Sequence, residues 1–332
     1  MPARVQSLVY GLGLNKQTSI SSPGSTFLRF RKLNMDIHTP EYTTETDKDE
    51  IGKGNEFISE VFPVAYTASG RVEKYGSAEY MTWAWAYALG NVTFGSGIYT
   101  IVPIDPTVTL ELPYFSIVQQ LGEGGGMAVD EVYVGNAVED VTTTYNYGTG
   151  RQSCKTTVNW AGSGRNTEPS GITVPSVLAE HYMLSASMAA NINGTDYVAG
   201  KTLLNGTMAW KNNLAVGAGY FPGSGLVNNA AVAGRLEIGN RVPTFTFTAR
   251  LLHTSTEYAA LIAQTTGTAT ITFTYDGTHT VTFTWEQLSY QAVTKGEEGG
   301  IVTVQVTGAP QFNSVNGVVS VSAQCGLTGV AQ

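Results

Sequence analysis

Threonine occupies alternate positions on both sides of one turn in the segment TATITFTYDGTHTVTFTW, Thr268 to Trp285. Before the turn the threonines alternate with Ala269, Ile271, Phe273 and Tyr275, which is the period of two expected of a strand. The Asp-Gly turn between two such runs predicts a β-hairpin. One face of this hairpin is apolar and packs on a core, while the other carries hydroxyls and no charge.

The length of the turn fixes the register of the hairpin. A two-residue loop puts Phe273 opposite Thr280 and mixes the two faces, whereas a three-residue loop from Tyr275 to Gly277 pairs Phe273 with His279 and keeps each face pure. We therefore predict the three-residue loop. The hydroxyl face is then a candidate contact surface or a plain solvated ladder, and its central residues are Thr270, Thr272, Thr274, Thr280 and Thr282.

The composition limits the classes of partner. Charged residues make up 13% of the chain, about half of the roughly 25% usual for soluble domains, which indicates that much of the surface meets other subunits. The 18 Lys and Arg against 26 Asp and Glu give a net charge of -8, which argues against a broad basic patch for nucleic acid. The two cysteines, Cys154 and Cys325, do not indicate a disulfide framework.

Most of the chain reads as short strands separated by turn residues, which favours an all-β sandwich or barrel. Two segments have helical character. The first is GSAEYMTWAWAYALG, with Ser77 as the cap and Gly90 as the end, and the second is STEYAALIAQTTG, with Ser255 and Gly267 in the same roles. No stretch approaches the ~20 apolar residues that span a bilayer, and the N-terminus carries no secretion signal, so we expect no membrane contact.

The two halves of the chain share an order of elements. Glu-Ile-Gly occurs at 50–52 and at 237–239, and in each half a proline, a strand and a capped helix follow. We infer an internal duplication, with two similar β-sandwich or tube domains that each carry one short flanking helix. The polar stretch 162–176 holds the boundary, so the predicted domains are 1–165, with an N-terminal arm, and 166–332.

Catalytic and metal motifs are not found in the sequence. The histidines His38, His181, His253 and His279 have no spacing typical of a metal site, and neither a nucleophile elbow nor a phosphate-binding loop occurs. We therefore expect neither an enzyme nor a cofactor. The acidic run from Asp47 resembles the start of a calcium loop, but Ile58 stands at the last ligand position. A solvated or partner-contacting loop is the better interpretation.

Four segments, taken in order, resemble the tail tube (major tail) protein of long-tailed bacteriophages. They are TDKDEIGKG, SAEYMTWAWAYALG, EVYVGNAVEDVTTTYNYGTG and VTFTWEQLSYQAVTKGEEGGIVTVQVTG. The resemblance implies a structural virion protein that assembles in the bacterial cytoplasm into stacked rings, forming a hollow tail tube through which DNA leaves the capsid. It also implies tape-measure, tail terminator and tail tip proteins as partners.

The resemblance assigns roles to two sets of residues. Long loops of this family reach the adjacent ring, which implies a ring-to-ring contact at Asp47, Lys48, Asp49, Glu50, Ile51, Gly52 and Lys53, and more weakly at 217–239. The threonine face is expected to line the lumen or to contact a neighbouring subunit, because hydroxyls wet a wall without holding a polyanion. Rings of this family are commonly six-fold, so a duplicated chain favours three copies per ring over six.

A surface β-sandwich that recognises carbohydrate or protein is the alternative. Its site would be built from exposed aromatic residues. The aromatic residues of the first helical segment, Tyr80, Trp83, Trp85 and Tyr87, have helical spacing, which predicts packing in a core or interface instead of a binding platform.

Overall fold

A computed structural model describes residues 5–31, 34–35, 41–48, 58–123, 126–147, 154–167, 175–222, 226–227, 230–314 and 317–332. The helices are α1 (Ala78–Leu89) and α2 (Glu257–Ile262), and there are short 3-10 turns at η1 (Ser185–Ser187) and η2 (Val216–Gly219). The earlier strands are β1 (Val5–Gly13), β2 (Phe27–Leu28), β3 (Asn34–Met35), β4 (Glu41–Lys48), β5 (Ile58–Tyr75), β6 (Gly90–Gly95), β7 (Ile98–Pro103), β8 (Phe115–Glu123), β9 (Gly126–Asn146) and β10 (Cys154–Thr167). The later strands are β11 (Met188–Ile192), β12 (Thr195–Asp196), β13 (Leu203–Lys211), β14 (Leu226–Val227), β15 (Ala230–Val232), β16 (Val242–Arg250), β17 (Gly267–Asp276), β18 (His279–Glu298), β19 (Ile301–Gln311) and β20 (Val319–Gln324).

The protein is an all-β fold of mostly antiparallel strands, as predicted. We call the series β5, β10, β9, β13, β16, β19 and the second part of β18 the long sheet. The short sheet is β11, β17, the first part of β18, β20, β7 and β6. Because β18 pairs with β20 up to Trp285, with β17 up to Leu288 and with β19 from Gln287, this one strand joins the two sheets.

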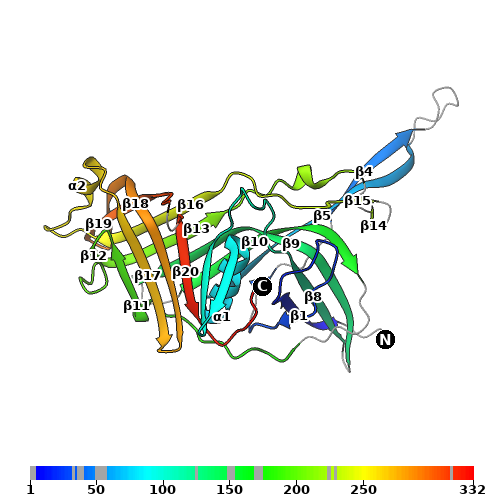
Figure 1. Ribbon diagram of the computed structural model, residues 1–332, viewed down its shortest axis with the longest axis horizontal. Helices are drawn as coiled ribbons and strands as arrows, with labels where there is room; N and C mark the ends of the chain where they lie inside the picture. Colours follow the sequence, from blue (N-terminus) through cyan, green and yellow to red (C-terminus); the bar gives the residue numbers. More distant parts are fainter. Residues whose placement is uncertain are drawn as a thin grey trace.

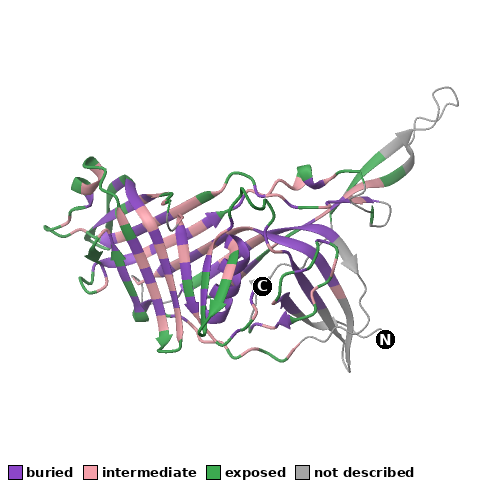
Figure 2. Cartoon of the chain, in the orientation of Figure 1, coloured by how far each residue is buried: buried purple, intermediate pink, exposed green. Residues whose placement is uncertain are grey.

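The two sheets pack face to face on an aromatic core (Figure 1). Phe245 of the long sheet meets Trp285 at 5.9 Å between ring centroids, and Tyr145 of the long sheet meets Phe273 of the short sheet at 6.1 Å. All four side chains are buried. Figure 2 shows buried and half-exposed residues alternating along the strands, which is the pattern of a sheet with one face on the core.

Helix α1 lies inside the sandwich. Ser77 caps it by accepting a hydrogen bond from the Tyr80 N–H at 3.2 Å, and Gly90 ends it in the left-handed conformation with φ 87°, as the sequence predicts. All 12 of its residues are buried. The predicted position at the flank of a sheet is wrong, because a helix without a polar face needs apolar partners on every side.

Helix α2 is shorter than predicted. It begins after Thr256, which makes no side-chain cap, and its C-cap is Ala263 instead of Gly267. The predicted cap, Ser255, instead accepts a hydrogen bond from the Leu252 N–H at 2.9 Å. The two helices therefore differ in length and in surroundings, and the structure does not show the inferred duplication.

Contacts cross the predicted boundary between residues 165 and 166. Strand β10 runs through it to Thr167, and β9 pairs with β13 from Asn146↔Asn205 to Asp140↔Lys211. One cluster of buried residues extends from Tyr10 to Ala331. The division into 1–165 and 166–332 stays a prediction, and the described parts of both ranges share this core.

Strands β4 and β5 form an arm that extends away from the body (Figure 1). The backbone pairs Asp47 with Glu60 and Lys48 with Ile58 near the end of β4. The remaining residues of the predicted contact loop, Asp49, Glu50, Ile51, Gly52 and Lys53, lie outside the described residues. Within the described part of the chain, no helix is long and apolar enough to cross a membrane.

Candidate functional site

The predicted threonines lie together on the outer face of the short sheet. Thr272 is directly opposite Thr282, Thr274 is opposite Thr280, and Thr270 is opposite Thr284. The hydroxyls of Thr272 and Thr282 are 3.1 Å apart and hydrogen-bonded. All of these side chains are half-buried, and their neighbours along the strands point into the core.

The predicted register of this hairpin is wrong. Phe273 pairs with Val281 instead of His279, and the turn residues are Gly277 and Thr278. The ladder shifts between Thr274 and Asp276, so an irregularity at Tyr275 takes up one residue and keeps both faces pure. Asp276 stabilises the turn by accepting hydrogen bonds from the N–H groups of Thr278 and His279, each at 2.8 Å.

The hydroxyl face continues across the neighbouring strands. Thr282 is opposite Ser322 on β20, Ser322 is opposite Thr100 on β7, and Thr100 is opposite Thr93 on β6. On the other side Thr272 is opposite Ala189 on β11. This row crosses the whole short sheet without a charged side chain. Glu286 lies at the margin, where it accepts a hydrogen bond from the Ser320 hydroxyl at 3.2 Å.

A second threonine face lies on the outside of the long sheet. One row along the pairing is Thr144 on β9, Thr207 on β13, Thr246 on β16 and Thr307 on β19. Thr142, Thr157, Thr244 and Thr248 belong to the same face, and all are half-buried. This face was not predicted from the sequence. The signal was present in PTFTFTARLL, where threonine alternates with phenylalanine, but only pairing across strands far apart in the sequence makes it one surface.

Charged residues on the long-sheet face lie at its ends. Glu73 on β5 binds Lys155 at 3.1 Å and Arg71 at 3.0 Å, and the Lys155 hydrogen bond is the main cause that lowers the pKa of Glu73. The backbone register places Lys211 of β13 opposite Asp140 of β9. Because the apolar faces of the two sheets meet, the two threonine faces point in opposite directions.

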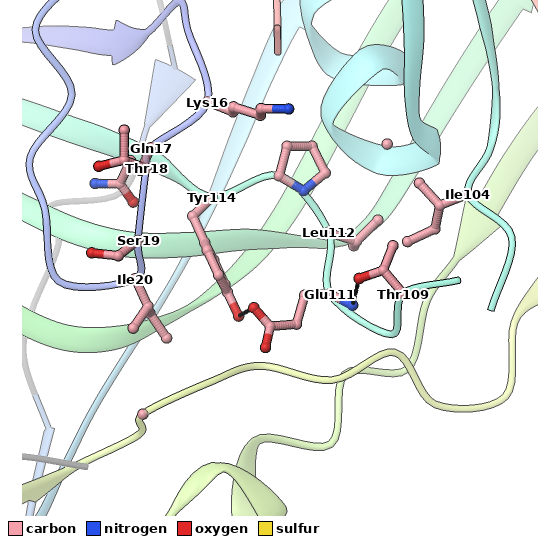
Figure 3. Close-up of a pocket in the computed structure, with 13 residues that line it drawn as sticks. Lys16, Gln17, Thr18, Ser19, Ile20, Ile104, Thr109, Glu111, Leu112 and Tyr114 are labelled. Atoms are coloured by element: carbon pink, nitrogen blue, oxygen red, sulfur yellow. Dashed lines mark hydrogen bonds between the residues drawn. The ribbon is translucent and has the colours of Figure 1, made fainter. Parts of the chain in front are cut away.

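A polar cavity of about 510 Å³ lies beside the end of α1 (Figure 3). Its walls include Lys16, Thr18, Glu111 and Tyr114, and the Tyr114 hydroxyl donates to a Glu111 carboxylate oxygen at 3.0 Å. The same hydroxyl accepts from the Leu236 N–H at 2.9 Å, and burial is the main cause that raises the pKa of Tyr114. These groups hold neighbouring loops together and do not form an acid–base pair aimed into the cavity.

A larger cavity of about 930 Å³ lies between β7, β16 and the segment before β20. Trp210, Arg241, Glu286 and Phe312 line it, and the Phe312 side chain is exposed. The Arg241 guanidinium donates to the Ile104 carbonyl oxygen at 2.8 Å and lies 5.7 Å from the Trp210 ring. Apolar walls with one cation and one carboxylate could bind a small amphiphilic ligand.

The aromatic residues of α1 do not form a binding platform. Tyr80, Trp83, Trp85 and Tyr87 are all fully buried. The Trp83 ring donates to the Gly13 carbonyl oxygen at 2.8 Å, and the Trp85 ring donates to the Thr143 hydroxyl at 3.0 Å. The predicted packing role of these residues is confirmed.

Two histidines that the sequence leaves unpaired meet in space. The rings of His181 and His279 are stacked with centroids 3.5 Å apart, and His181 is 2.7 Å from a carboxylate oxygen of Glu79. His253 is exposed, and His38 lies outside the described residues. Residues 79, 181 and 279 are too far apart in the chain for any spacing rule to find this cluster.

No protein-family model matches the chain, and a search of curated proteins finds no match.

Proposed function

We propose that the protein is the subunit of a hollow tail tube of a long-tailed bacteriophage, and that the threonine face of the long sheet lines the lumen. The observation that carries this proposal is a wide sheet face whose centre is hydroxyl-rich and uncharged. The uncharged centre runs from β9 through β13 to β16 and β19, and Lys155 on β10 lies opposite Thr144 at its border. A wall of this kind suits the passage of a polyanion that must not be retained.

Electrostatics favours an uncharged wall. Duplex DNA carries one phosphate charge per ~1.7 Å of axis, so unpaired lysines along the lumen would hold it through salt-dependent contacts. At the β5 end of this face, Arg71 and Lys155 are each paired with Glu73. Their pairing reduces the positive potential that passing DNA would meet.

The edge of the long sheet supports self-assembly. Within the described residues, positions 292–298 of β18 pair with β19 on one side, and no other strand pairs with them on the other. An edge strand of this length is a template for a strand from another chain. We propose that a neighbouring copy continues the sheet there, so that a ring closes without free edges. Three copies per ring fit the inferred duplication, and six remain the other outcome.

The arm of β4 and β5 supports contacts between rings. It extends from the body beyond the sheets, and Val61 and Phe62 on it are exposed apolar side chains, with 59% and 38% of their surface accessible (Figure 1). We propose that the arm and the segment from Asp47 to Lys53 pack on the next ring.

The short-sheet threonine face, which points away from the lumen, would then contact a neighbouring subunit or face outward. Tape-measure, terminator and tail tip proteins are the partners of such a tube.

Negative-stain electron microscopy of the purified protein, with light scattering for mass, tests the assembly. Hollow rings or tubes are the expected result, and ring averages choose between three and six copies. A monodisperse monomer that stays unchanged on concentration and with added tail-initiation proteins would contradict the proposal.

Two matched variants test which face lines the lumen. Thr207→Lys with Thr246→Lys adds two cations at directly opposed positions of the long sheet, and Thr272→Lys with Thr282→Lys does the same on the short sheet. In assembled tubes, the first variant should retain DNA and slow its release, while the second should release it normally. The reverse outcome would assign the lumen to the short sheet.

A surface binding module is the second candidate function, and the 930 Å³ cavity favours it. Phe312 and Trp210 would supply the apolar contacts, and Arg241 the polar one. Binding of a carbohydrate or peptide by the monomer, abolished by Arg241→Ala or Phe312→Ala, would support this alternative.

A further inference from the structure

We propose that Glu79, His181 and His279 form a binding site for one divalent transition-metal ion, with Zn²⁺ as the best fit. One ligand atom from each of these residues lies within 4.8 Å of the other two. Two imidazoles and one carboxylate are a donor set that suits Zn²⁺, and water completes the coordination. The site is independent of the proposed tube function.

The carboxylate of Glu79 is held in place before any ion binds. Its side chain is 1% exposed, and one oxygen accepts a hydrogen bond from the His181 backbone N–H at 3.0 Å. The other oxygen is 2.7 Å from His181 Nδ1. A buried carboxylate fixed beside an imidazole costs little further ordering on binding an ion.

His279 is oriented by a second carboxylate. Its Nδ1 is 2.9 Å from Asp276 Oδ1, and that oxygen also accepts from the Thr278 and His279 N–H groups. Because an ionised carboxylate only accepts, Nδ1 carries the proton and Nε2 keeps a free lone pair. A carboxylate that orients a histidine in this way is typical of metal sites.

The stacked rings must tilt apart to converge on one ion, because their planes are nearly parallel and tetrahedral ligands approach a metal at a wide angle. Their planes are inclined by 24°, and the site is accessible because His181 is 29% exposed and His279 is 16% exposed. Metal–nitrogen distances of about 2.0–2.1 Å require the rings to tilt apart at their nitrogen edges. The neighbouring Glu180 is bound to Lys74 at 2.8 Å and is therefore not a competing ligand.

An ion at this site would link three distant parts of the chain. Glu79 is in the first turn of α1, His181 is in the segment before β11, and His279 begins β18. Because such a site exists only in the folded chain, binding adds to folding stability. We therefore expect Zn²⁺ to raise the melting temperature.

Calorimetric titration of the EDTA-treated protein with ZnCl₂ tests the site. The expected result is one ion per chain, with affinity at least about 10-fold weaker in His279→Gln and in His181→Gln, and weaker by about 10-fold in Asp276→Asn. His253→Gln is the matched control, because this exposed histidine lies outside the cluster. Equal affinity in the wild type and His279→Gln, or no binding by the wild type, would overturn the proposal.

A labelling experiment keeps the test decisive if a variant fails to fold. Diethyl pyrocarbonate modifies accessible imidazoles, and mass spectrometry reports the modified positions. In the wild-type protein, ZnCl₂ should protect His181 and His279 and leave His253 reactive. Equal labelling of all three with and without Zn²⁺ would count against the site.

Discussion

Thr272 and Thr282 face each other across β17 and β18, and their hydroxyls are hydrogen-bonded at 3.1 Å on the outer face of the sandwich. On the opposite side of the same strands, Ile271 and Phe283 are paired in the core with no exposed surface. Folding therefore depends on one side of this hairpin, and the other side is free to serve contacts.

Replacing both hydroxyls should leave the fold intact. In Thr272→Val with Thr282→Val, both partners of the hydrogen bond become apolar together, which leaves no unpaired group and keeps β-branched residues in the strands. We expect the free energy of unfolding, measured with urea, to change by less than about 1 kcal/mol. Ile271→Ala is the control on the same strand and should cost about 2–5 kcal/mol. A large loss in the valine variant would show that the hydroxyl face is structural.

Gly70 should not tolerate a side chain. It pairs with Trp160 across β5 and β10, and an added Cβ would lie 2.1 Å from the Trp160 ring. Since Trp160 is buried, the ring cannot move aside freely, and Gly70→Ala should destabilise the protein by about 1–3 kcal/mol in urea unfolding. Gly277→Ala is the control, because nothing lies within 4 Å of its added Cβ. Equal effects of the two substitutions would contradict the packing argument.

Local sequence signals predicted local structure well. The alternation in β17 and β18 identified both faces of the hairpin, and Ser77 and Gly90 marked the ends of α1. These features depend on residues close in the chain. The register of the hairpin was missed because the irregularity at Tyr275 depends on the backbone and has no residue signature of its own.

The features that the sequence did not predict depend on pairing between strands far apart in the chain. The pairing of β9 with β13 builds the second threonine face, and no short window of sequence contains both strands. The same limit applies to α1. Its apolar composition predicts that it is buried, but it does not tell whether one sheet or two sheets cover the helix. The cluster of Glu79, His181 and His279 is likewise assembled only by the tertiary fold.

The contribution of Asp276 to the stability of the protein should depend on pH. Hydrogen bonds, first from the Thr278 N–H and then from His279, hold the pKa of this exposed carboxyl well below its usual range. A carboxyl with a depressed pKa contributes stability above its unfolded pKa, and this contribution is lost as the pH falls through its folded pKa. The difference in melting temperature between wild type and Asp276→Asn should therefore shrink below pH ~4. A constant difference from pH 7 to pH 2 would contradict this assignment.

Lys74 and Glu180 form a buried ion pair, and removing one partner should destabilise the protein more than removing both. The two groups are 2.8 Å apart, with side chains 2% and 0% exposed, and Lys74 also donates to the Arg31 carbonyl oxygen at 2.7 Å. Lys74→Met leaves the Glu180 carboxylate buried without its cation, which should cost about 3–5 kcal/mol in urea unfolding. Adding Glu180→Gln removes the uncompensated charge, so the double variant should recover part of that loss.

Because Arg71→Met breaks an exposed pair with Glu73, it should cost about 1 kcal/mol or less. Equal losses in Lys74→Met and Arg71→Met would show that burial does not make the Lys74 pair special.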